Sequence, residues 1–430
     1  MKWIDITDML AWSGYYTGIQ RVTYEYAKRF NGNGAKFFLY DTVDDRFVEV
    51  SFDRLTEIDV PTISTEHGSI SRRKKLRNIL GAPYYRLSLE SQAALRPYVD
   101  AANYTVRLGM DRVARLKKAH NVDISVYSPL PTAKMSKGDT VVMIGAAWND
   151  HRVLDAVIKR KKQVGFRISQ HINDILPIYQ PQLFADELPL VFNPYVENVV
   201  KNADIITVIS EATKRDLSIY CSERHIEPPL IEVLRLGDNP EIRGVATRPE
   251  GVHVNEYILA VGTFEVRKNY ILLYQAYKLA QIEVRKIPPL IIVGRKGWLS
   301  SDIRHMLERD PFAKENIVWL SDVSDEEVKW LYQNCLFTVF PSIAEGWGLP
   351  VAESLQNGKF CLSSGVSSML EIGNGLVDYF LPYDARECME KILYYYEEDR
   401  YIAKNKKVLE KYTTFTWDDS YSQLNSILKG

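Results

Sequence analysis

Residues 345–353 place two carboxylates around a glycine-containing turn. Glu345 and Glu353 are separated by seven residues, with Gly346, Gly348 and Pro350 between them. Glycines let a backbone approach a ligand closely, and Pro350 favours the start of a helix, which attracts anions. A carboxylate accepts hydrogen bonds from neighbouring hydroxyls. The segment therefore predicts a site for a ligand with phosphate and vicinal hydroxyl groups; the alternative is an ordinary strand-to-helix turn with solvated carboxylates.

Two adjacent cations, Arg267 and Lys268, follow a predicted strand and Gly262. Arginine offers a planar fork and lysine a point charge, so the pair can meet both phosphates of a diphosphate. Positive charge opposes the helix dipole at a helix start. This disfavours the alternative in which both are ordinary surface cations.

The first half of the chain has two polar loops after predicted strands. Gly18 and Arg21 lie at the first strand-to-helix junction, and His171 and Asp174 follow a strand near residue 170. Strand ends that open onto polar loops are ligand sites in α/β sheets. The alternatives are an exposed Arg21 at a plain helix start and a hydrogen-bonded structural His171.

The Glu345–Glu353 segment resembles the E-x7-E signature of retaining GT-B glycosyltransferases, family 4 in particular. The resemblance implies that Glu345 is catalytic beside the donor sugar, that Glu353 holds the ribose, and that Arg267 and Lys268 bind the diphosphate. It covers the second half nearly continuously and the first half in patches. It also assigns donor binding to Gly346, Trp347, Gly348, Leu349 and Gly294.

In the first half, the resemblance implies that His171 and Asp174 are catalytic and that Gly18 and Arg21 meet the donor phosphates or the acceptor. One departure stands out. Asp174 matches the family's His-Asp-x-x-Pro loop, but Asn173 occupies the histidine position and His171 stands two residues earlier. Whether His171 takes the place of the family histidine is left open.

The elements that position these residues alternate between strands and helices, which predicts α/β architecture with parallel sheets. Strands are expected at 2–6, 140–144, 165–172, 204–209, 257–261, 290–293, 317–320 and 337–340, with a helix at 19–30 and a capping box at Ser324. The resemblance implies a GT-B fold of two Rossmann-like domains. We expect an acceptor-side domain at 1–240, a nucleotide-sugar domain at 255–410, and a helix at 411–430 that crosses back.

Composition excludes several other classes of protein. The chain has 430 residues, 46% hydrophobic and 25% charged, with a net charge of -1, which argues against nucleic-acid binding. Four cysteines without CxxC spacing predict reduced thiols. The N-terminus carries Asp5 and Asp8 where a signal peptide would be apolar. These features favour a cytoplasmic enzyme.

A basic insertion is expected at about 70–120. Between Ser71 and His120, twelve Lys and Arg stand against three acidic residues. Such a stretch could contact an anionic membrane surface at the inner face of the cytoplasmic membrane, or bind an anionic acceptor; the alternative is a solvated helical insertion.

The expected function is transfer of a sugar from a nucleotide sugar, with GDP-mannose the first choice, to a saccharide or lipid-linked saccharide in cell-surface glycan synthesis. No metal and no further cofactor are expected, because Arg267 and Lys268 supply the positive charge and no Asp-x-Asp motif is suitably placed. The alternatives are a GT-B phosphorylase, a sugar-nucleotide epimerase, or a non-catalytic nucleotide-sugar-binding scaffold. A dinucleotide oxidoreductase is disfavoured, because this chain has no Gly-x-Gly-x-x-Gly motif after its first predicted strand.

Overall fold

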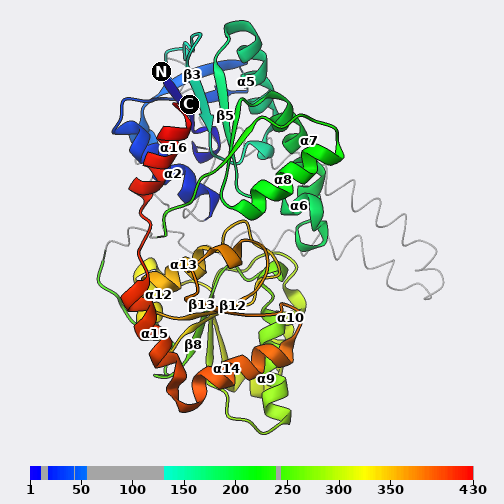
Figure 1. Ribbon diagram of the computed structural model, residues 1–430, viewed down its shortest axis with the longest axis vertical. Coiled ribbons are helices and arrows are strands. Elements are labelled where there is room, and N and C mark those ends of the chain that lie inside the picture. The colour runs from blue at the N-terminus through cyan, green and yellow to red at the C-terminus, as the bar shows by residue number, and fades with distance from the viewer. Residues whose placement is uncertain (11–17, 43, 56–129, 239–243, 430) are drawn as a thin grey trace, which may run out of the picture.

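The computed structural model describes residues 1–430 except 11–17, 43, 56–129, 239–243 and 430. The described chain forms two stacked halves, each with a central sheet (Figure 1). We call residues 1–238 with the last helix the N half, and residues 244–411 the C half. The basic insertion expected at 70–120 lies outside the described residues.

The N half contains a seven-stranded sheet of order β3-β2-β1-β4-β5-β6-β7. All neighbours pair in parallel except β2 and β3. Its strands are β1 (Lys2–Asp5), β2 (Lys36–Asp41), β3 (Arg46–Val50), β4 (Thr140–Met143), β5 (Arg167–Ile172), β6 (Ile205–Val208) and β7 (Leu230–Val233).

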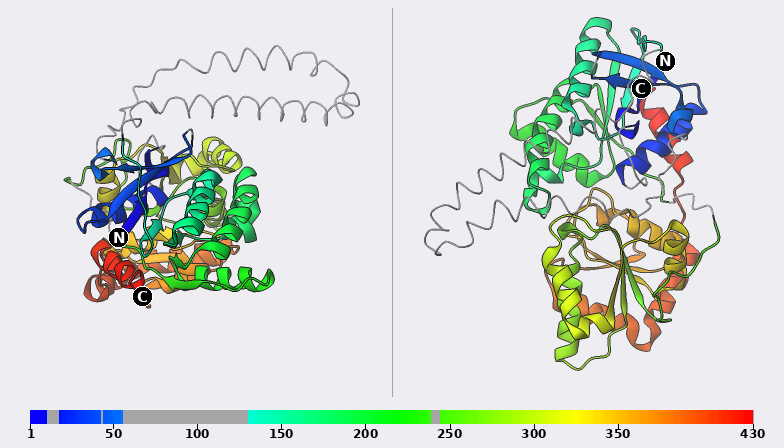
Figure 2. Two further views of the ribbon diagram at one scale, coloured as in Figure 1. Left: turned by 90° about the horizontal axis from the view of Figure 1, so that it is seen from above. Right: turned by 180° about the vertical axis from the view of Figure 1, so that it is seen from behind.

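Helices cover this sheet on both faces (Figure 2). They are α1 (Thr7–Leu10), α2 (Ile19–Asn31), α5 (His151–Val164), α6 (Leu176–Tyr179), α7 (Glu187–Asn202) and α8 (Glu211–Glu223). Gly165, with φ of 82°, ends α5 in the left-handed region, so the strand predicted from residue 165 begins at Arg167. The hydroxyl of Ser210 caps α8 by accepting from the Thr213 amide at 3.0 Å.

The C half contains a six-stranded, all-parallel sheet of order β10-β9-β8-β11-β12-β13. Its strands are β8 (Ile258–Val261), β9 (Leu290–Val293), β10 (Ile317–Leu320), β11 (Thr338–Phe340), β12 (Cys361–Ser364) and β13 (Val377–Phe380). The chain order reverses between β8 and β11, as it does between β1 and β4 in the N half. Open parallel sheets bind ligands beyond the carboxyl ends of the strands at such switch points.

The helices of the C half are α9 (Tyr270–Ile282), α10 (Ser301–Arg309), α11 (Pro311–Asn316), α12 (Asp325–Asn334), α13 (Leu349–Gln356), α14 (Ala385–Tyr396) and α15 (Arg400–Lys411). The predicted capping box at Ser324 is confirmed, because Ser324 and Glu327 exchange side-chain to backbone hydrogen bonds. Two single-turn helices, η6 (Val266–Lys268) and η7 (Ser367–Glu371), lie in loops.

The chain crosses between the halves twice. After the second crossing, α16 (Trp417–Ile427) packs on α2 in the N half (Figure 1). Asp238 joins the two crossings: its carboxylate accepts from the Tyr412 hydroxyl at 2.7 Å and the Phe415 amide at 2.9 Å. Gly237 is required here, since a Cβ would lie 2.6 Å from the Trp417 ring. The connection between the two expected domains is partly packed, because Val252 is buried.

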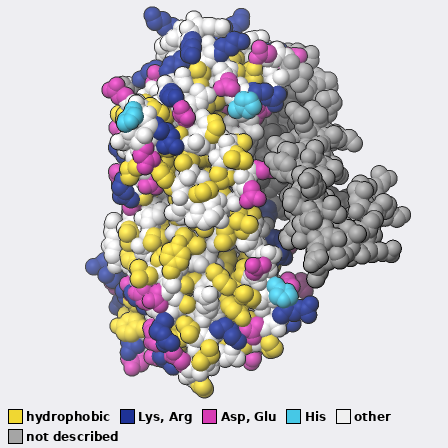
Figure 3. All heavy atoms as spheres, turned by 90° about the vertical axis from the view of Figure 1, so that its right-hand side faces the viewer, with side chains coloured by type: hydrophobic (Ala, Val, Ile, Leu, Met, Phe, Trp, Pro, Cys, Tyr) yellow, Lys and Arg dark blue, Asp and Glu magenta, His cyan; other side chains and the backbone are white. Residues whose placement is uncertain are grey.

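One apolar cluster runs through both halves and includes Val22, Ile209 and Leu236 from the N half with Trp347 and Met369 from the C half. The four cysteines are free and buried. No helix in the described ranges is long and apolar enough to cross a membrane. On the face shown in Figure 3, hydrophobic side chains lie among charged ones over both halves.

Candidate active site

The loops after β8 and β11 flank the switch point of the C half and carry the predicted cations and carboxylate. Arg267 and Lys268 lie in η6. Asn269 follows with φ of 59°, and its side-chain amide donates to the carbonyls of Pro341 at 3.0 Å and Pro382 at 2.7 Å. This side chain therefore fixes the η6 loop against the β11 loop.

Glu345 lies between the two cations. Its carboxylate accepts from the Arg267 guanidinium, from Lys268 Nζ at 2.7 Å and from Ser342 Oγ at 2.5 Å. Arg267 also donates to Glu265 Oε1 at 2.8 Å. All four charged residues are largely withdrawn from solvent, with Glu345 only 8% exposed. Two cations and two carboxylates thus form one compact cluster.

Charges in this cluster stabilise one another. Burial opposes ionisation of Glu345, but Arg267 and Lys268 outweigh it and lower its pKa to about 2. Burial also disfavours the charge of Arg267, yet Glu345 and Glu265 raise its pKa above the ordinary value. Glu265 is different: its burial dominates, and its pKa is raised despite Arg267. Both Arg267 and Glu345 are therefore charged at neutral pH.

A cavity of about 290 Å³ opens beside Glu353, between α12, α13 and Arg21 of the N half. Glu353 accepts from the Tyr332 hydroxyl at 3.0 Å, and burial raises its pKa, partly offset by Arg21. Arg21 lies 3.7 Å from Glu353 and 4.0 Å from Asp325. The structure therefore places Arg21 at the Glu353 end of the site. The remaining wall consists of two hydrophobic side chains, one cation and two amides: Val261, Val328, Lys329, Gln356 and Asn357.

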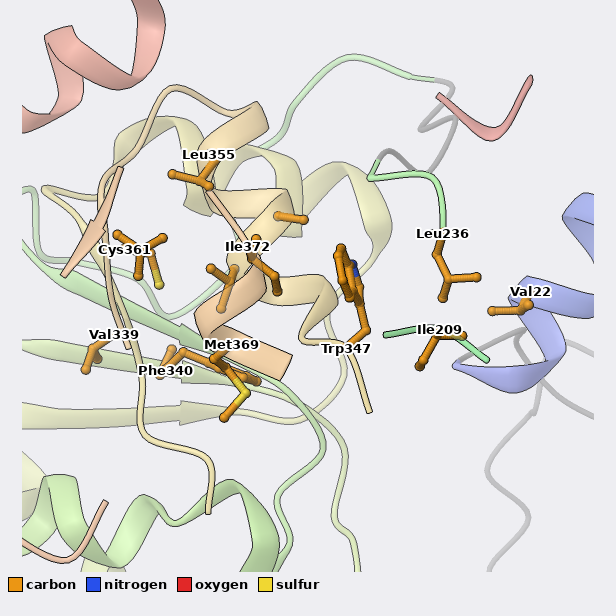
Figure 4. Packing of buried hydrophobic residues seen from close by; sticks show 14 of the residues in the cluster. Val22, Ile209, Leu236, Val339, Phe340, Trp347, Leu355, Cys361, Met369 and Ile372 are labelled. Carbon is orange, nitrogen blue, oxygen red and sulfur yellow. The ribbon is translucent and has the colours of Figure 1, made fainter. Parts of the chain in front are cut away.

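The turn after Glu345 joins the two halves. A Cβ on Gly346 would lie 2.6 Å from the Asn173 carbonyl oxygen. Trp347 lies between the apolar side chains of the C half and Ile209, Leu236 and Val22 of the N half (Figure 4). Gly348, with φ of 117°, precedes Leu349 at the start of α13. Trp347 is thus buried as an interdomain contact.

Gly294 and Gly18 have backbone reasons to be glycine. A Cβ on Gly294 would lie 1.8 Å from the Gly262 carbonyl oxygen, so the loops after β8 and β9 can touch only without one. Gly18 precedes α2 with φ of 51°. The predicted ligand roles of these two glycines stay predictions.

Comparison with known proteins agrees with this geometry. Residues 248–413 match the family described as glycosyl transferases group 1. This match covers nearly the whole C half. O-antigen chain mannosyltransferase B of Escherichia coli is 34% identical over 170 residues, 39% of this chain and 44% of that protein. Serotype-specific mannosyltransferase WbdA of Escherichia coli is 25% identical over 265 residues, 58% and 32% of the two chains. The chain spans less than half the length of these relatives.

Solved structures share this fold of two α/β halves. A sucrose-phosphate synthase from Thermosynechococcus elongatus has a TM-score of 0.59 at 15% identity, covering 100% of this chain and 98% of its own. Anabaena HepE in complex with UDP and glucose has a TM-score of 0.58 at 16% identity, covering 100% and 99%. The expected GT-B architecture is confirmed.

Opposite the C half, the loop after β5 presents Asn173 and Asp174. A Cβ on Gly346 would be 3.0 Å from Asp174 Cβ. Burial raises the pKa of Asp174, and Arg267 partly offsets this. His171 instead lies within β5, 2% exposed, with Nδ1 at 3.0 Å from Thr207 Oγ1 and its ring edge-on to Tyr26. Asn173, rather than His171, is therefore the residue that meets the C half.

His171 is an uncharged residue of the N half. Burial lowers its pKa to about 4, and the Asn173 side chain offsets only part of this shift. Its predicted catalytic role has no support from its position inside the sheet, next to α2.

Three residues of the site were not singled out from the sequence. Glu265 belongs to the charged cluster, and Ser342 donates to Glu345 within it. Glu371, in η7 of the C half, accepts from the amides of Glu211 and Ala212 at 2.8 Å each, at the start of α8 in the N half. This cap joins residues of the two halves, so it depends on tertiary structure.

The part of the chain that the structure describes holds no cluster of three or more His, Cys, Asp or Glu side chains arranged to bind a metal ion.

Proposed function

We propose that the chain is a retaining glycosyltransferase that moves mannose from GDP-mannose to a saccharide or lipid-linked saccharide acceptor in cell-surface polysaccharide synthesis. The observation that carries this proposal is the Arg267–Lys268–Glu345 cluster at the switch point of the C half, facing the loop of Asn173 and Asp174. Because the chain spans only part of its relatives, the activity of the whole protein belongs to the proposal.

The charged cluster suits departure of a nucleoside diphosphate. Arg267 and Lys268 are held in place by Glu345 before the donor arrives. Positive groups that are already in place stabilise the negative charge that develops in the transition state. They lower the activation barrier because they do not have to move during the reaction. α13 begins at Leu349, directly after the Glu345 loop, and the positive end of its helix dipole adds to this field. The proposal therefore needs neither a metal ion nor a cofactor beyond the donor.

Glu353 supports a nucleoside in the neighbouring cavity, where its carboxylate would accept the ribose hydroxyls. The relatives named above are mannosyltransferases, which favours mannose as the sugar. Asp325 lines the same cavity with an exposed carboxylate. A carboxylate only accepts hydrogen bonds, and guanine presents an N1–H beside an amino group, whereas uracil presents one N–H between two carbonyls. This difference favours GDP over UDP.

A donor screen tests the proposal. GDP-mannose, UDP-glucose, UDP-N-acetylglucosamine and dTDP-rhamnose are offered with mannoside acceptors, and release of nucleoside diphosphate is measured. Release of GDP with an α-linked product by NMR is expected from the α-configured donor. A product with inverted anomeric configuration would rule out retention. If none of the four donors is turned over, the glycosyltransferase proposal is wrong. Release of a sugar 1-phosphate that depends on phosphate would indicate a phosphorylase. Conversion of the donor into another nucleotide sugar would indicate an epimerase. Tight nucleotide binding without turnover would indicate a non-catalytic scaffold.

A further inference from the structure

The switch point of the N half is built from the same two loop positions as that of the C half. Asp8 follows β1, as Arg267 and Lys268 follow β8. Gly145 and Ala146 follow β4, as Glu345 follows β11. Residues at these positions lie where an open α/β sheet binds its ligand. The function proposed above assigns nothing to Asp8.

Asp8 is held over the end of β4. Its Oδ2 accepts from the Ala146 amide at 2.8 Å. A Cβ on Gly145 would lie 2.2 Å from Oδ1 of Asp8, so only glycine leaves room for the carboxylate. Burial raises the pKa of Asp8, and the Ala146 amide offsets part of this shift. The backbone amides of Met9 and of Asp8 itself also donate to this carboxylate. Since a carboxylate has about four acceptor positions, Asp8 retains capacity for a further donor.

A buried hydroxyl and an aromatic ring accompany Asp8. Tyr195 of α7 is 5% exposed, and its hydroxyl has no hydrogen-bond partner among the described residues. The loop after β4 connects Tyr195 to Asp8, because Ala146 donates to Asp8 and Trp148, two residues further on, contacts Tyr195. Burial and, to a smaller extent, the charge of Asp8 raise the pKa of Tyr195. Trp148, half-buried after β4, packs edge-on against Tyr195 with ring centroids 5.6 Å apart. An unpartnered buried hydroxyl usually has a ligand or water to bind.

This group of residues lies on the way to the donor site. β1, β4 and β5 are adjacent and parallel, with Asp5 opposite Met143 and Met143 opposite Gln170. Continuing this register, the positions of Asp8, Ala146 and Asn173 follow one another along the carboxyl edge of the sheet. Asn173 touches Gly346 of the C half. A ligand at Asp8 is therefore on the acceptor side of the Glu345 cluster.

We propose that Asp8, Tyr195 and Trp148 form a subsite for an uncharged sugar unit of the acceptor. Asp8 accepts hydrogen bonds from sugar hydroxyls, Tyr195 exchanges one with a further hydroxyl, and Trp148 offers an apolar surface for C–H groups. A phosphorylated sugar is excluded from this subsite, because Asp8 would repel it. The proposal rests on the glycosyltransferase function, since it makes this sugar the acceptor.

The test separates saccharide binding from nucleotide binding. Asp8→Asn and Tyr195→Phe are compared with the parent protein and with two matched controls, Asp155→Asn and Tyr179→Phe, which alter exposed groups of the N half. Binding of methyl glycosides of mannose, glucose, galactose and N-acetylglucosamine is measured by saturation-transfer NMR without donor. GDP binding is measured by calorimetry.

Asp8→Asn is expected to weaken glycoside binding about 10-fold and Tyr195→Phe several-fold, since each removes a hydrogen bond to the sugar. GDP affinity and both controls should stay at the parent value. If the enzyme turns over, the acceptor KM rises in both variants while the donor KM does not. Thermal melting reports folding of each variant, and Tyr195→Phe carries the test if Asp8→Asn fails to fold.

Two results overturn the subsite: no glycoside binds the parent protein, or both variants bind it as the parent does. Failure of the donor proposal looks different. In that case GDP and other nucleotides do not bind, while the glycosides still bind in a manner that depends on Asp8 and Tyr195.

Discussion

Two pairs of buried ionisable groups, one in each half of the chain, respond to burial in opposite ways. In the C half, Glu345 and Arg267 are buried and charged, because each has a partner of opposite sign. In the N half, burial favours the uncharged forms of Asp5 and His171, since it raises the pKa of Asp5 to about 7 and lowers that of His171 to about 4. A buried group therefore keeps its charge where a partner of opposite sign is within hydrogen-bond distance.

The largest expected effect comes from breaking the charged cluster. Lys268→Ala removes a cation that we propose to bind the leaving diphosphate, and Glu345→Ala leaves two cations without their shared carboxylate. Each is expected to lower kcat by about 100-fold or more. Turnover of donor is the measurement, with Lys314→Ala, an exposed lysine of α11, as control. Parent-like kcat in both variants would show that the cluster is structural.

The second prediction concerns the uncharged forms of Asp5 and His171, which should make the free energy of unfolding depend on pH. Asp5 has a raised pKa, so its stabilising contribution is complete below the unfolded value and is lost as pH rises to about 7. His171 has a lowered pKa, so its contribution is complete above about 6.5 and is lost as pH falls to about 4. Between about pH 4 and 6.5 the two slopes oppose each other, each about 1.4 kcal/mol per pH unit.

Asp5→Asn should therefore gain stability relative to the parent as pH rises from about 4 to 7. His171→Gln should lose stability relative to the parent as pH rises from about 4 to 6.5. The double variant should run parallel to the parent. Denaturant unfolding at several pH values measures these differences; single variants that both parallel the parent would contradict the neutral states.

Asp325→Asn sharpens the comparison at the donor end. Loss of the carboxylate beside Glu353 should reduce the preference for GDP over UDP by about 10-fold, since a hydrogen bond to a charged acceptor is lost. Calorimetry with both nucleotides gives the ratio. Glu326→Gln is the matched control, because this neighbouring acid does not line the cavity. An unchanged ratio of GDP to UDP affinity would show that Asp325 does not recognise guanine.

The smallest expected effect is at the contact between the halves. Glu371→Gln replaces the carboxylate that accepts from two amides of α8. Loss of this cap should cost about 1 kcal/mol and favour separation of the halves. Small-angle scattering should show a larger radius of gyration and steady-state assays a kcat lowered a few-fold. Glu308→Gln, exposed on α10, should behave as the parent.

The sequence was more informative about the donor side for a physical reason. Arg267, Lys268, Glu345 and Glu353 lie in two short segments whose spacing already suggests their chemistry, and the strands before them are strongly apolar. Asp8 meets Ala146 and Tyr195 only after folding, across more than a hundred positions. No local sequence pattern predicts such a long-range contact. The sequence left the place of His171 open, because it does not fix the end of a strand to within two residues. His171 lies inside β5, and Asn173 lies in the loop that follows.

Joining the two crossings at Asp238 makes the C half an insertion within the N half. Asp238 and Tyr412 are hydrogen-bonded although 174 positions separate them, and α16 beyond Tyr412 packs on α2. The insertion begins and ends at neighbouring points on one surface. Such an arrangement permits exchange of the inserted unit without threading the remaining sheet. The C half can therefore be exchanged as a unit, provided that the replacement keeps the packing of Trp347 against Val22, Ile209 and Leu236.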